Sequence, residues 1–151
     1  MLSNIVLPWL HYLAILMMAG AAVAELYLLK LKPTSEIVQL LPRVDRFYGI
    51  TAAAVLVTGL LRVWYGGKGV EYYWGNGAFY GVLGAFVLAT LVSLAPTFRF
   101  MRWKKTEANS GALPDEAEVR KTRPLIHIQL MLVAVIALLI TMVARGYTAT
   151  P

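Results

Sequence analysis

The chain has 151 residues, of which 59% are hydrophobic and 15% charged, and an ordinary soluble domain has about half apolar and about a quarter charged residues. A net charge of +6 would suit a nucleic-acid partner in a soluble protein, but here the basic residues lie beside apolar runs, where orientation in a bilayer accounts for them, so we expect no nucleic-acid partner. The absence of cysteine excludes disulfides and Cys-based zinc or iron–sulfur sites.

Four apolar stretches are long enough to cross a hydrocarbon core about 30 Å thick, which takes about 20 helical residues. In chain order they cover residues 5–29, 48–66, 78–98 and 124–144. The first has no basic residue before it and is longer than the apolar core of a secretion signal, so we expect a retained helix. The sequence therefore predicts an all-α, polytopic membrane protein: one domain over residues 1–151, folded in the lipid bilayer as a bundle of four transmembrane helices.

The connections between the spans differ in charge, which predicts their orientation. The first and third connections are rich in lysine and arginine, whereas the opposite side has only Arg62, Lys68 and Arg145 near it. Basic loops stay on the cytoplasmic side of a membrane. We therefore predict a cytoplasmic loop over about 99–123 and both termini outside, which is the periplasm if the membrane is the bacterial inner membrane that we expect.

The third connection contains the one segment that we expect to be flexible, around residues 106–118, because it is polar and rich in turn-forming residues. Asp115 and Glu118 are placed to cap a short lead-in to the last span. In the third span, the spacing of Gly77 and Gly81 predicts a small-residue face on which a neighbouring helix packs closely.

Polar side chains inside the spans are the candidates for function, because an ionisable group in hydrocarbon is costly and usually faces a partner or a cavity. At about 100° per residue, His11 and Glu25 share one face of the first helix. Thr58 and Arg62 share one face of the second helix by the same arithmetic. His127 lies on the fourth helix at a depth similar to that of Glu25.

Depth along the helices sorts these residues into two layers. We predict an outer cavity, bounded by His11, Tyr12, Thr58 and Arg62, as the binding site. An inner layer holds Glu25 and His127, for which we expect a direct contact, either functional or as a polar clamp that fixes the register of the helices.

The residue types of the outer layer indicate the chemistry that it could support. A neutral imidazole is a good ligand for haem, and an arginine at the same level could meet a propionate, a carboxylate or a quinone oxygen. His11 and His127 lie on the order of 20 Å apart along the membrane normal, so they cannot both ligate one haem. We predict no separate metal site.

Several strings of the chain resemble an uncharacterised family of bacterial four-helix membrane proteins, a domain of unknown function. The resemblance covers nearly the whole chain. It rests on Trp9-Leu-His-Tyr12, Asp45-Arg-Phe-Tyr-Gly49, Thr58-Gly-Leu-Leu-Arg62, Gly66-Gly-Lys-Gly69, Pro96-Thr-Phe-Arg99 and Ile126-His-Ile-Gln129.

The chain is more distantly similar to the HemJ-type protoporphyrinogen oxidases, which are also small four-helix membrane proteins. His11 matches the first-helix histidine of that family, and Arg43 to Tyr48 loosely matches the Arg-x-x-Tyr-like string that opens its second helix. The likeness implies haem b with His11 as a ligand. The family's third-helix lysine, the proposed partner of that histidine, has no counterpart, since Val82 stands at about its place.

Three functions remain open from the sequence. The first is a HemJ-like protein, associated with haem or linked to a quinone, in which His11 is the ligand or proton relay and Arg62 binds an anion. The second is a small transporter or channel subunit with a polar path through Glu25, Thr58, Arg62 and His127. The third is a non-catalytic scaffold or partner subunit. Four helices bury only a modest interior, so a homo-oligomer is plausible under any of the three.

Overall fold

The protein is a bundle of long helices. The computed structural model describes residues 3–66 and 68–147, and no strand occurs among them. The helices are α1 (Ser3–Leu28), α2 (Ser35–Tyr65), α3 (Val70–Trp74), α4 (Gly77–Ser110) and α5 (Glu116–Ala144). All but α3 are long and apolar enough to cross a membrane, which confirms the predicted all-α membrane protein with four spanning helices.

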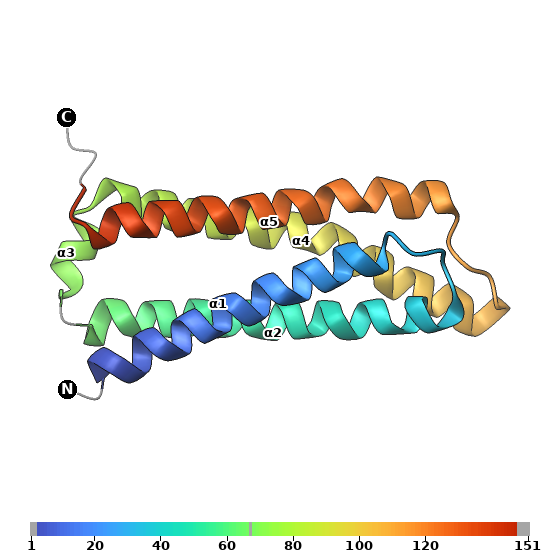
Figure 1. Ribbon diagram of the computed structural model, residues 1–151, viewed down its shortest axis with the longest axis horizontal. Helices are drawn as coiled ribbons and strands as arrows, with labels where there is room; N and C mark the ends of the chain where they lie inside the picture. The colour runs from blue at the N-terminus through green and yellow to red at the C-terminus, as the bar shows by residue number, and fades with distance from the viewer. Residues whose placement is uncertain (1–2, 67, 148–151) are drawn as a thin grey trace.

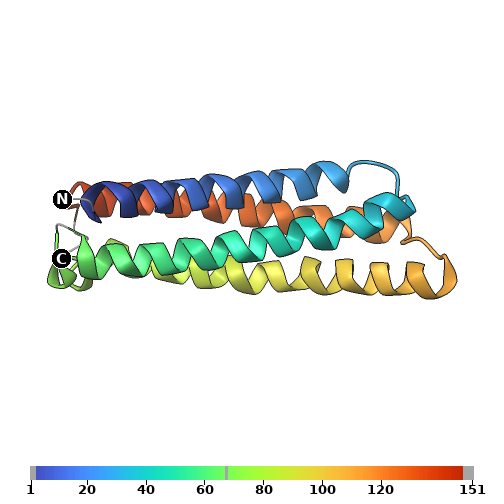
Figure 2. The ribbon, with the colours of Figure 1, turned by 90° about the horizontal axis from the view of Figure 1, so that it is seen from below.

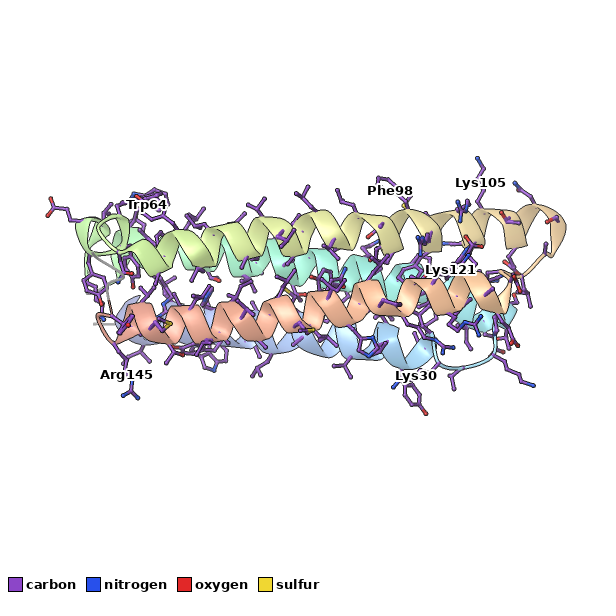
Figure 3. The ribbon with its side chains drawn as sticks, turned by 90° about the horizontal axis from the view of Figure 1, so that it is seen from above. Lys30, Trp64, Phe98, Lys105, Lys121 and Arg145 are labelled. Carbon is purple, nitrogen blue, oxygen red and sulfur yellow. The ribbon has the colours of Figure 1, made fainter. Side chains whose placement is uncertain are left out.

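The four long helices form two hairpins that lie side by side (Figures 1 and 2). The helix α1 packs mainly against α2, and α4 packs mainly against α5. Less extensive contacts join α2 to α4 and α1 to α5, so α1 and α4 are diagonally opposed. The helix α1 begins and α5 ends at the end of the bundle that carries α3, which we call the α3 end (Figure 1). We call the other end, where Lys30, Lys105 and Lys121 lie, the basic end (Figure 3).

The helices extend beyond the predicted spans at the basic end. The helix α2 begins near residue 35, where the Thr34 hydroxyl accepts a hydrogen bond from the Ile37 amide. The segment 99–123, expected as a loop between two spans, is mostly helical, because α4 and α5 run through it and only residues 111–115 lie between them. Its lysines, arginines and glutamates are good helix formers. The helix α4 ends where Gly111 adopts a left-handed conformation with φ of 68°.

The residues that face out of the bundle are as apolar as those inside it. Leu16, Phe98 and Met131 are each about two-thirds exposed, and Figure 3 shows Phe98 directed away from the helices. An aqueous surface would carry far fewer such side chains, and a lipid-facing surface requires them. The main buried cluster contains Met18, Phe100 and other residues of all four long helices.

The small-residue face of α4 packs closely at one of the predicted positions. A Cβ atom added to Gly81 would lie 3.3 Å from Leu139 Cδ1, so a side chain of α5 sits directly over this glycine. A Cβ atom at Gly84 would meet nothing within 4 Å. The predicted close approach is therefore confirmed at Gly81 and comes from α5.

Side chains satisfy carbonyl groups where two helices end. At the α3 end, the hydroxyl of Tyr72 donates to the carbonyl of Val143, and Lys68 donates to the carbonyl of Ala144. At the basic end, Arg123 Nε donates to the carbonyl of Leu29 over 2.9 Å. These bonds matter because the last carbonyls of a helix have no partner within it.

The bond from Tyr72 to α5 can be tested with a matched pair of variants. We expect Tyr72→Phe to lower the free energy of unfolding by about 1 kcal/mol, because one hydrogen bond to a helix end is lost. Tyr73→Phe is the control, since no hydrogen bond of the Tyr73 hydroxyl is found among the described residues. Thermal unfolding of the detergent-solubilised protein measures the difference, and an equal effect of both variants would contradict the assignment.

Candidate functional site

The predicted outer site is built where α1 and α2 cross near the α3 end. His11 Nδ1 lies 2.8 Å from Thr58 Oγ1. The imidazole packs directly on the backbone of α2, because a Cβ atom added to Gly59 would come within 3.2 Å of His11 Cε1. Glycine at this position therefore allows the contact between the two helices.

The hydroxyl of Thr58 sets the orientation and the tautomer of the ring. It donates its single hydrogen to the carbonyl of Ala54, over 2.6 Å, and so it can only accept from His11. We therefore expect the neutral ring to carry its proton on Nδ1 and a lone pair on Nε2. No hydrogen bond of Nε2 is found among the described residues. A histidine held in this way is oriented as a ligand or a proton acceptor.

Arg62 and Tyr12 complete the outer site. The Arg62 guanidinium carbon lies 5.4 Å from the centre of the Tyr12 ring, a cation–π contact. Tyr12 is exposed on the outer surface of α1. Within residues 3–66 and 68–147, the guanidinium makes no hydrogen bond or ion pair. The structure thus brings together the four residues predicted for the site: Tyr12 is exposed, and His11, Thr58 and Arg62 are half-buried.

The expected contact between Glu25 and His127 is not formed. Glu25 is only 1% exposed, and its Oε1 has no hydrogen-bond partner in the described part of the chain. His127 is exposed, and its Nδ1 donates to the carbonyl of Arg123 in the preceding turn of α5. Neither a hydrogen bond nor an ion pair joins the two side chains among the described residues.

Helical geometry explains why His127 points away from the bundle. The buried face of α5 contains Val119, Thr122, Ile126 and Gln129, which recur at helical spacing. His127 follows Ile126 by about 100° around the helix and so lies off this face. The two polar residues among the buried four, Thr122 and Gln129, are the signal that would have identified the inward face.

A second polar group, not predicted as a site, surrounds Asp45 in the basic half of the bundle. The carboxylate of Asp45 is 9% exposed and accepts a hydrogen bond of 2.8 Å from Thr97 of α4. Tyr48 is buried one turn along α2, and the buried Glu25 of α1 lies near both residues. Asp45 precedes the predicted second span of residues 48–66, and it lies within a helix because α2 begins earlier than expected.

A groove of about 1030 Å³ runs between α2 and α4. Its walls are mainly apolar, but they also contain Asp45 and Thr97, which are hydrogen-bonded to each other. Its volume is at the upper end of the range for ligand sites, about 300–1,000 Å³. None of the four residues of the outer site lines it. The molecule therefore has two separate candidate regions.

Comparison with known proteins places the chain in a family without assigning an activity. A family model described as "Predicted membrane protein (DUF2214)" matches residues 3–148. The chain belongs to this family. No curated protein and no solved structure matches it. The predicted membership of an uncharacterised membrane-protein family is thus confirmed, and the function has to be argued from the geometry.

The tautomer of His11 is open to direct measurement, because the chain has only two histidines. We expect the neutral His11 ring to carry its proton on Nδ1, and Thr58→Val to remove this preference, since valine offers no acceptor. Nitrogen-15 chemical shifts of histidine-labelled protein report the tautomer, with His127→Gln used for assignment.

Thr51→Val is the control for that experiment, because the Thr51 hydroxyl bonds only to the backbone of its own helix. A spectrum in which both threonine variants retain the wild-type shifts of His11 would disprove the role of Thr58.

The bond between Asp45 and Thr97 should contribute to stability. We expect Thr97→Val to cost about 1–3 kcal/mol in the free energy of unfolding, because a buried carboxyl loses its partner. Thr90→Val, also in the wall of the groove, should change it by less than about 0.5 kcal/mol, since the Thr90 hydroxyl bonds only to the carbonyl of Phe86. Denaturant unfolding in detergent compares the two variants.

Proposed function

We propose that the protein is a quinone-linked redox protein of the membrane, and that the quinone binds at the outer site formed by His11, Tyr12, Thr58 and Arg62. One observation carries the proposal: His11 Nε2 and the Arg62 guanidinium lie in one site near the α3 end, and no hydrogen bond of either is found among the described residues. Such groups are costly in hydrocarbon unless a ligand meets them.

A quinone has the chemistry that these side chains require. Its ring is soluble in lipid, so it reaches the exposed surface of α1 and α2 laterally. Its carbonyl oxygens accept hydrogen bonds, which the guanidinium of Arg62 can donate. Reduction of a quinone to a quinol takes up two electrons and two protons, and oxidation of the quinol releases them. The lone pair of His11 Nε2 is suited to accept one of these protons from a quinol hydroxyl. The electrons would come from a redox partner in the membrane.

Haem b with two axial ligands does not fit the residues present. His11 could supply one ligand, but Val82, at the place of the lysine in the HemJ-type enzymes, packs in an apolar cluster with Val63, Phe79 and Val143. It also belongs to α4, which is diagonally opposed to α1. The groove between α2 and α4 has no histidine in its lining. We therefore prefer a quinone to haem as the ligand.

A polar transport path has less support than the redox proposal. Glu25, Tyr48 and Asp45 form one polar group, and His11 belongs to another. Between the two levels, the buried face of α1 carries Ala14, Met18, Ala21 and Ala22. The buried face of α2 carries Val55 and Thr51, and the Thr51 hydroxyl bonds to the backbone of its own helix. Mainly apolar side chains therefore separate the two polar groups along the interface of α1 and α2.

Binding of a short-chain ubiquinone analogue tests the proposal, with quenching of tryptophan fluorescence as the signal. We expect Arg62→Gln to weaken binding of the quinone about tenfold or more, because it removes a charged hydrogen bond to a carbonyl oxygen. We expect His11→Ala to weaken binding of the corresponding quinol to a similar extent, because the hydroxyl of a quinol can donate to His11 Nε2. His127→Ala and Arg145→Gln are the matched controls, since both residues are exposed on α5 or at its end.

Absorption spectra of the oxidised and the dithionite-reduced protein should be taken first. A Soret band that His11→Ala abolishes would favour haem and overturn the choice of a quinone. Unchanged quinone binding in folded Arg62→Gln protein, together with unchanged quinol binding in folded His11→Ala protein, would refute the site itself.

A further inference from the structure

We propose that the groove between α2 and α4 is a specific binding site for one anionic glycerophospholipid. The acyl chains would lie along the apolar part of the groove, and the phosphate would meet Arg46, Lys104 and Lys105 at its basic end. This site is distinct from the quinone site, shares no residue with it, and does not depend on the proposed redox function.

Small residues create the space for the chains. Gly49, Ala52 and Ala53 of α2 and Ala89 of α4 line the groove, and these helices make a less extensive contact than those within each hairpin. A Cβ atom added to Gly49 would meet nothing within 4 Å, so the space in front of this residue is open. The remaining lining in this part is apolar and includes Leu56 and Phe86.

Like a phospholipid, the groove is apolar over most of its length and charged at one end. On α4, the wall from Phe86 to Leu94 is mostly apolar, whereas Lys104 and Lys105 stand nearer the basic end. At about 1.5 Å per residue, the two lysines lie roughly 10 Å beyond Thr97. On α2, Arg46 likewise lies nearer the basic end than Gly49. The groove is thus apolar toward the middle of the bundle and cationic toward the layer of headgroups.

In the described part of the chain, no acidic side chain forms an ion pair with any of the three cations. Among residues 3–66 and 68–147, the one ion pair joins Arg102 to Glu118, and neither residue lines the groove. No hydrogen bond of the side chains of Arg46, Lys104 or Lys105 is found in this part of the chain. Asp45 is the one carboxylate in the lining, and its Oδ1 accepts from Thr97. The lining therefore has an excess of positive charge.

Charge and shape together favour an anionic phospholipid over the other possible occupants. An apolar helix from a second copy would leave the three cations without counter-charges, and a quinone carries no charge for them to meet. A zwitterionic lipid brings a positive group along with its phosphate. A lipid such as phosphatidylglycerol brings two chains for the apolar part and a phosphate for the cations.

Native mass spectrometry of the whole detergent-solubilised protein with added phosphatidylglycerol or phosphatidylcholine tests the proposal. We expect one phosphatidylglycerol to remain bound under conditions that remove phosphatidylcholine. The double variant Lys104→Gln, Lys105→Gln should weaken this binding about tenfold or more, because two phosphate contacts are lost. The control is the double variant Arg120→Gln, Lys121→Gln. It removes the charges of two exposed residues of α5 that are neighbours in sequence and lie outside the groove.

A second pair of variants tests the apolar part without changing the charge. Gly49→Leu fills open space in the groove and should abolish the retention of phosphatidylglycerol. Gly84→Leu is its control, because Gly84 also faces open space but does not line the groove. Equal retention of the two lipids, equal losses in the two charge variants, or full retention in folded Gly49→Leu protein would each overturn the proposal.

Discussion

The structure depends on one constraint: within hydrocarbon, every backbone amide and carbonyl must find its partner inside the protein. Long helices meet this requirement along their length, and side chains meet it where helices end, as Tyr72 and Arg123 do for α5 and α1. Because the outer surface can be as apolar as the core, hydrophobicity alone does not distinguish inside from outside. The information about function therefore lies in the few polar side chains and in the spaces between helices.

The sequence predicted the features that follow from length, composition and local periodicity. It predicted four spanning helices, and it brought His11, Tyr12, Thr58 and Arg62 to one level, where the structure also places them together. It did not predict the ends of the helices. Charged residues mark the edge of hydrocarbon in a hydropathy pattern, but they do not end a helix, so α4 continues to Gly111 and α2 starts before Asp45.

Features that depend on tertiary packing could not be predicted from one sequence. The depth of His127 was estimated from its position along α5, but its direction depends on which face of α5 is buried, and that face carries Gln129. The bond between Asp45 and Thr97 joins residues with no characteristic spacing. The groove arises because small residues of α2 and α4 face each other, and no local pattern distinguishes small residues that fit tightly from those that leave a void.

The division into two hairpins has a consequence for how the protein assembles. Each hairpin has an extensive interface of its own, whereas the surface between α2 and α4 is less extensive and contains the groove. Helices that are inserted first and associate later would form the two hairpins before these dock against each other. The docking step occurs within the bilayer, among freely diffusing lipids. A molecule of the surrounding membrane can therefore be enclosed as the hairpins close, and become a component of the mature fold.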